Sequence, residues 1–177
     1  MNPDRIIKEA QIAYNHKKYQ VAATAYETAA QVYTTNGDEL NAAEMRNNSS
    51  VAFLQANNPQ AALAIVQGTE QVFAVAGDVR RQAFALGNTA AALEALGRLV
   101  DSATTYEESA SLLKQIGETD LRASVMQALS AVQLRLGRQL EAVVTMQSGL
   151  EDITQPSVTQ KLAKKILQSP INILRQK

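Results

Sequence analysis

The amino-acid sequence predicts an all-α protein, a right-handed α-solenoid of four helical hairpins closed by a C-terminal capping helix. One observation is a glycine followed by an acid that recurs every 40 residues, at Gly37-Asp38, Gly77-Asp78 and Gly117-Glu118. A second break recurs in the same register, at Asn57-Asn58-Pro59, Gly97-Arg98 and Gly137-Arg138. The breaks divide each unit into two segments that are too long for strands and of the right length for helices. Each repeat is therefore predicted to be a helical hairpin.

The ends of the predicted helices have recognisable signals. Asn2 and Pro3 suit the cap and the first position of a helix, so the first hairpin begins near Pro3. Gly37, Gly77 and Gly117 each supply a left-handed closing residue for the helix before them, and the acid after each glycine can cap the next helix. The later first helices are expected at 39–56, 79–96 and 119–136, and the second helices at 17–36, 57–76, 97–116 and 137–156.

The second helices align without a gap and share a packing pattern in which small, large and small residues alternate. The three columns hold Ala22, Ala62, Ser102 and Ala142, then Tyr26, Val66, Tyr106 and Met146, then Ala29, Thr69, Ser109 and Gly149. Residues four and three apart lie on one face of a helix, so a small residue admits the paired helix while the large one fills the space beyond it. The first helices have similar small columns, among them Ser50, Ala90 and Ser130.

We expect one solenoid domain over residues 1–169, with units at about 1–36, 37–76, 77–116 and 117–156 and a cap at 157–169. The cap would place Val158, Leu162 and Ile166 on one stripe, as the end of a solenoid requires. The remaining residues, 170–177, form a basic and apolar tail. Five positive charges and no acid follow Asp152. Such a segment could instead touch an anionic membrane surface or mediate self-association.

Composition excludes several classes of protein. Hydrophobic residues make up 46% of the 177 residues, enough for a substantial core. Basic and acidic residues both number 17, which argues against a protein that holds nucleic acid through phosphate contacts. There is no cysteine, and no apolar run approaches the roughly 18 residues of a membrane span. We expect a cytoplasmic protein that needs no cofactor.

The helical columns resemble the tetratricopeptide repeat, most closely over residues 88–110. The 40-residue units are similar to the long-helix subclass exemplified by kinesin light chains. HEAT repeats share this period, but their proline in the first helix and their Asp/Arg pair after the turn do not recur here. The resemblance implies that the first helices line a concave groove, where similar proteins use asparagines to hold the backbone of an extended peptide.

Equivalent positions of the first helices should form rows along that groove. One row holds Lys8, Asn48, Asn88 and Ala128, and a neighbouring row holds Ile7, Asn47, Gly87 and Gln127. The groove residues that we predict are Asn47, Asn48, Val51, Gln55, Arg81, Asn88, Gln127 and Arg135. An alternative is that Asn48 and Asn88 bridge adjacent helices or face water. Phe84, beside the same surface, is expected to belong to the core.

Catalysis is not supported by the residue types present. His16, the one histidine, lies at the first hairpin turn among polar neighbours, where a buried catalytic triad is improbable. The acids at Glu107-Glu108 and Glu151-Asp152 are sequence neighbours, which point about 100° apart on a helix. No phosphate-binding glycine motif occurs. We therefore predict a non-catalytic scaffold that binds a protein or peptide, with association between like chains or with a membrane surface as the alternative.

Overall fold

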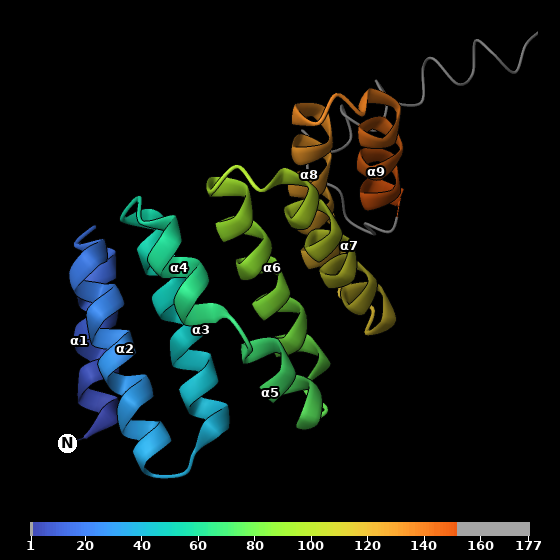
Figure 1. Ribbon diagram of the computed structural model, residues 1–177. Coiled ribbons are helices and arrows are strands. Elements are labelled where there is room, and N and C mark those ends of the chain that lie inside the picture. Colours follow the sequence, from blue (N-terminus) through green and yellow to red (C-terminus); the bar gives the residue numbers. More distant parts are fainter. Residues whose placement is uncertain (1, 152–177) are drawn as a thin grey trace, which may run out of the picture.

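The structure is a computed structural model that describes residues 2–151, and within them it has nine α-helices and no strand (Figure 1). The helices are α1 (Pro3–Asn15), α2 (Tyr19–Thr35), α3 (Glu39–Gln55), α4 (Pro59–Val66), α5 (Thr69–Val75), α6 (Val79–Ala95), α7 (Leu99–Gln115), α8 (Thr119–Arg135) and α9 (Gln139–Glu151). The prediction of an all-α, tetratricopeptide-like solenoid is confirmed. The predicted cap at 157–169 and the tail at 170–177 lie outside the described residues, and so do the functions suggested for them.

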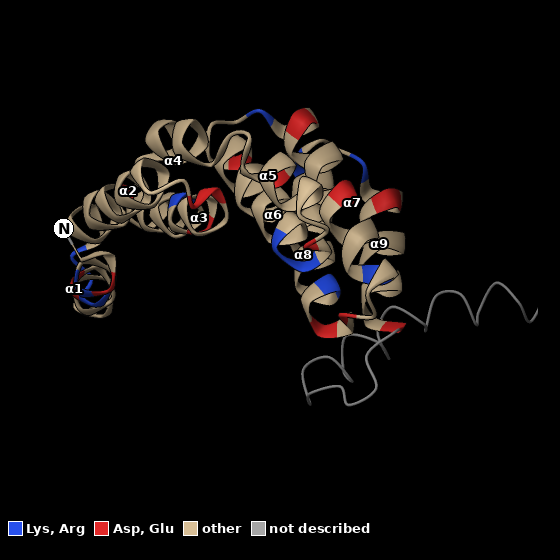
Figure 2. Ribbon diagram, turned by 90° about the horizontal axis from the view of Figure 1, so that it is seen from below, with Lys and Arg blue, Asp and Glu red and all other residues tan. Residues whose placement is uncertain are grey.

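The helices follow one another in a curved arc. Helices adjacent in sequence pack against each other, as α1 does with α2 and α6 with α7. Figure 2 shows α3, α6 and α8 toward the inner side of the arc and α4, α5 and α7 toward its outer side. The first helices of the hairpins therefore line the hollow side, as the repeat pattern predicts.

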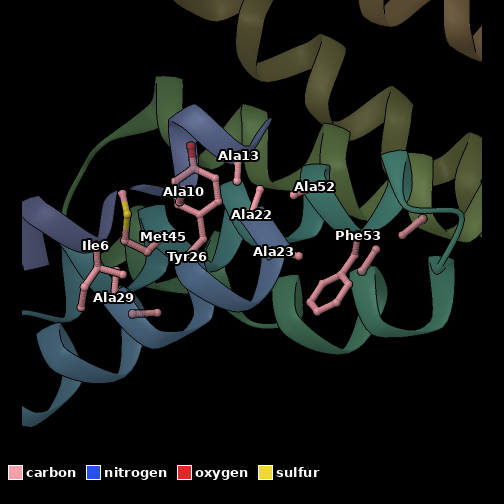
Figure 3. Close-up of a cluster of buried hydrophobic side chains, with 13 residues drawn as sticks. Ile6, Ala10, Ala13, Ala22, Ala23, Tyr26, Ala29, Met45, Ala52 and Phe53 are labelled. Carbon is pink, nitrogen blue, oxygen red and sulfur yellow. The ribbon is translucent and has the colours of Figure 1, made fainter. Parts of the chain in front are cut away.

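Small residues let the paired helices approach closely. Ala22, Ala62 and Ala142 are at most 1% exposed. Tyr26 fills the space beside Ala10 and Ala22 in the first hairpin (Figure 3). One serine in each later hairpin donates to a carbonyl oxygen of the paired helix, at 2.9 Å in all three: Ser50 to Ala62, Ser102 to Ala90 and Ser130 to Ala142. These buried hydroxyls are thus satisfied where the helices touch.

The helix ends behave as the sequence predicts. Gly37, Gly77 and Gly117 have φ of 76°, 71° and 73°, the left-handed conformation that glycine adopts without a steric penalty. The side chains of Asp38 and Asp78 accept hydrogen bonds from backbone N–H groups of the helices that follow. Glu118, at the equivalent position, makes no side-chain cap bond.

The second helix of the second hairpin departs from the expectation. The sequence predicted one helix over 57–76, but it is broken into α4 and α5 at Gln67 and Gly68. Gly68 has φ of 85°, a left-handed conformation in the middle of what would otherwise be a continuous helix. The break brings α6 into contact with α3, α4 and α5 together. The successive first helices α3 and α6 are in contact here, whereas α6 and α8 are in marginal contact at most.

Gly68→Ala tests the cause of this break. An added Cβ would meet only the Gln71 side-chain oxygen at 3.5 Å, so space is not limiting and the left-handed φ decides the outcome. We expect the variant to lose about 1–2 kcal/mol of unfolding free energy, measured by urea denaturation, because L-residues pay that cost in this conformation. The exposed Gln67→Ala substitution beside it is the control and should change stability little. A stability gain in Gly68→Ala would mean that α4 and α5 prefer to join.

Tyr106 should make the fold sensitive to alkaline pH. Its ring is 6% exposed, and burial, followed by the nearby charge of Glu94, raises the pKa of its hydroxyl above the usual value. Because the folded-state pKa lies above the unfolded value of about 10, the contribution of the protonated Tyr106 hydroxyl to folding stability is complete below pH 10. That contribution is lost as the pH rises further. We expect Tyr106→Phe to reduce the loss of stability between neutral pH and pH 11, measured by urea denaturation at each pH.

The effect of Tyr106→Phe on the free energy of unfolding at neutral pH should stay within about 1 kcal/mol, because the hydrogen bond that it removes is a long one, 3.3 Å to Glu94. Equal alkaline sensitivity in both proteins would contradict this role.

Candidate functional site

A pocket of about 330 Å³ opens where α3, α5 and α6 meet, beside the helix break. Its lining residues come from all three helices and are Glu44, Asn47, Asn48, Phe73, Arg80, Arg81, Phe84 and Asn88. Four of the eight predicted groove residues, Asn47, Asn48, Arg81 and Asn88, are therefore brought together in one place. The pocket is the candidate functional site, and we call it the junction pocket.

Asn47 joins the three helices at the back of the junction pocket. It is 8% exposed, and its amide nitrogen donates to the Ala43 carbonyl at 3.0 Å and to the Thr69 hydroxyl at 2.9 Å. Its oxygen accepts from the amide of Asn88 at 3.0 Å. Thr69 in turn donates to the carbonyl of Val66, the last residue of α4, at 2.7 Å. This network links α3 to both sides of the helix break and to α6.

Asn48 and Asn88 have different surroundings although they share a register position. Asn88 uses one amide hydrogen to bridge to Asn47, which is the helix-bridging role considered as the alternative. The half-buried side chain of Asn48 has no hydrogen-bond partner within residues 2–151. Its amide can both donate and accept, which is the pairing that a peptide group offers. Asn48 is thus the side chain of the pocket best placed to bind a partner.

Arg81 is held firmly in the wall of the junction pocket. Its guanidinium donates to Asp78 at 2.6 Å and to Glu44 at 3.1 Å, and it lies over the Phe73 ring at 5.2 Å. Hydrogen bonds from the backbone and side chain of Arg81 lower the pKa of the Asp78 carboxyl, so this pair stays ionised across the neutral range. Arg81 thereby connects the start of α6 to α3.

Arg80 and Phe84 form the opposite wall. The Arg80 guanidinium lies 4.9 Å from the centre of the Phe84 ring and donates to Glu118 at 2.8 Å. Phe84 is half-buried and lines the pocket, so the expectation that it belongs to the core was wrong. The reason is the helix break, which leaves a space at this junction instead of a close-packed layer.

The remaining predicted residues do not line the junction pocket. Val51 is half-buried and Gln55 is exposed, both further along α3, and Gln127 is exposed on α8. Arg135, on α8, was predicted only as a groove residue. Instead its guanidinium donates to Glu94 of α6 at 2.9 Å, which ties two successive first helices together.

Glu44, Phe73 and Arg80 were not predicted from the sequence. The ion pairs suggest a signal that could have found two of them, because each joins opposite charges almost one repeat apart. Arg81 and Glu44 are 37 residues apart, and Arg80 and Glu118 are 38 apart. Phe73 could be recognised as pocket-lining only once the break before α5 was known.

Within residues 2–151 no group of three or more His, Asp or Glu side chains is arranged to hold a metal ion. His16, Glu107 and Glu108 are exposed, as expected. None of the helices in this part of the chain combines the length and apolar character that a membrane span requires.

A comparison with known protein families gives a match. The model of the family described as SNAP, soluble NSF attachment protein, matches residues 4–169. No curated protein matches the chain. The match extends over nearly the whole sequence. The match does not test whether the repeats are of the kinesin-light-chain type, so that assignment stays a prediction.

Proposed function

The chain belongs to the family of soluble NSF attachment proteins, and from this premise we propose that it is a non-catalytic adaptor whose junction pocket binds a segment of a partner protein. The family consists of α-helical adaptors that take part in protein interactions. The finer proposal is that the partner's segment, an extended peptide or a helix, lies in the hollow lined by the first helices. A cytoplasmic location and the absence of a nucleic-acid partner belong to the same proposal, and association between like chains is the alternative.

The observation that carries the proposal is the convergence of polar side chains in the junction pocket. Asn48 is half-buried there and has no hydrogen-bond partner among the described residues, so a bound segment can supply one. Asn88 keeps one amide hydrogen beyond its bond to Asn47. Together the two amides offer a bound backbone both donors and an acceptor on the hollow side of the arc.

Asn48→Ala tests this proposal with little risk to the fold, since it breaks no hydrogen bond of the described chain. The full-length protein serves as bait for affinity capture, partners are identified by mass spectrometry, and the dissociation constant of each is measured by calorimetry. We expect the variant to bind about tenfold more weakly, the effect of one hydrogen bond lost at a desolvated contact. The Asn88→Ala substitution is less suitable because it also disturbs Asn47.

The matched control is Gln60→Ala, which removes an exposed amide from α4 on the outer side of the arc. It should bind partners like the unmodified protein. Equal affinity in Asn48→Ala, Gln60→Ala and the unmodified protein would place the binding surface elsewhere.

A further inference from the structure

We propose that the junction pocket receives one large uncharged side chain, aromatic or aliphatic, from the partner protein. This inference rests on the proposed function, because it names the group that the partner presents to the pocket. The size of the pocket, its aromatic residues and the pairing of its charges each support it.

The size of the pocket suits a single side chain. Its volume of about 330 Å³ lies at the lower end of the range for ligand sites, roughly 300–1,000 Å³. A whole helix, with a diameter of roughly 10–12 Å including side chains, would have to lie over the pocket and not inside it. One side chain can therefore enter while the backbone that carries it stays at the rim, near Asn48.

Two of the eight residues that line the pocket are aromatic. Phe73 and Phe84 come from α5 and α6 and both line the space, and Phe73 is almost completely buried at 1% exposure. A large apolar group that enters would be removed from water against the half-buried Phe84 ring, and aromatic pairs gain about 0.5–1.5 kcal/mol beyond the area that they bury. Phe73 lies beneath the guanidinium of Arg81 and supports the wall from within.

The charges around the pocket are already paired. Arg81 is bonded to Asp78 and Glu44, and Arg80 to Glu118. A charged side chain of either sign would have to compete with these pairs for its counter-charge in a partly desolvated site, which is costly. The unpartnered amide of Asn48 is neutral and can meet a peptide group or a hydroxyl. The pocket should therefore discriminate against acidic and basic side chains.

Titration of the full-length ¹⁵N-labelled protein with three small molecules tests this selectivity. The probes have one ring and one methyl group in common and differ in charge: p-cresol is neutral, p-toluate is an anion and p-methylbenzylammonium is a cation. We expect p-cresol to shift the amide resonances around Asn48 and Phe84 and to bind about tenfold more tightly than either charged probe, as the cost of an unpaired charge requires. Stronger binding of p-toluate or p-methylbenzylammonium, or no shift with p-cresol, would overturn the inference.

Two substitutions assign the binding to this pocket. Phe84→Ala removes one wall and should abolish the p-cresol shifts. Asn48→Asp preserves the size of the side chain and adds a negative charge. It should therefore weaken p-cresol binding, and p-methylbenzylammonium should become the probe that binds most tightly. Asn48→Asp keeps the test decisive if Phe84→Ala does not fold. Unchanged probe affinities in folded variants would show that the probes bind elsewhere and would refute the proposal.

Failure of this inference can be told apart from failure of the proposed function. If Asn48→Ala weakens partner binding but the probes show no preference for the neutral ring, the proposed partner-binding site is supported. The inference that the partner presents an uncharged side chain is then refuted. If p-cresol binds as expected but Asn48→Ala leaves partner binding unchanged, the pocket has the stated selectivity while the partner uses another surface.

Discussion

Phe73→Ala is expected to lower the free energy of unfolding by about 3–5 kcal/mol, the usual cost of removing a buried ring. The Phe73 side chain is 1% exposed and packs with Ala43 and Ala85, so alanines on both sides cannot move in to fill the space. The ring also supports the guanidinium of Arg81, which holds α6 to α3. Urea denaturation followed by the helical circular dichroism signal measures the loss.

Val75→Ala is the matched control for this prediction. Val75 lies two residues further along α5 and is 92% exposed, so its truncation should change stability by less than about 0.5 kcal/mol. A loss below about 1 kcal/mol in Phe73→Ala would mean that the junction collapses around the missing ring, contrary to the packing described.

Asn47→Ala is expected to lower the free energy of unfolding by about 2–3 kcal/mol, because a buried amide with three hydrogen bonds would be lost. The Ala43 carbonyl keeps its helical bonding and Thr69 keeps its bond to Val66, so the loss falls mainly on the connection between α3, α5 and α6. Because Asn88 donates to Asn47, the two residues should be coupled. A double-mutant cycle with Asn88→Ala should therefore give an interaction energy of at least about 0.5 kcal/mol.

The same cycle provides the test of the network. Asn48→Ala, one residue along the chain, serves as the control, because its side chain has no hydrogen-bond partner within residues 2–151. If Asn47→Ala and Asn88→Ala were additive, the hydrogen bond between them would contribute nothing to the stability of the junction.

The helical hairpins could be predicted because their signals are local and repeat. A glycine that must adopt a positive φ, an acid after it, and small residues where helices touch all recur with one period. Each repetition is independent evidence for the same unit, so the start of α3, α6 and α8 could be placed almost to the residue. Propensity alone would not have given this precision.

The junction pocket could be predicted only in part. The repeat pattern correctly predicted that Asn48 and Asn88 lie on the same surface. It also predicted, wrongly, that every junction between units has the same structure. Gly68 makes one junction different, and its effect on the chain direction depends on how α5 packs against α3 and α6. Gly149 carries a similar signal in the sequence, yet it lies inside the continuous α9, packed closely against Met126. A glycine within a helical pattern therefore does not by itself say whether the helix breaks.

The packing of each helix mainly against its neighbours in sequence also has a kinetic consequence. Contacts of short sequence separation close small loops, and chains rich in them cross low entropic barriers and fold in microseconds to milliseconds. Assembly of this chain can begin at any hairpin and spread outward. The meeting of α3 with α6 is the exception, because it closes a longer loop that contains α4 and α5, so we expect it to form late in folding.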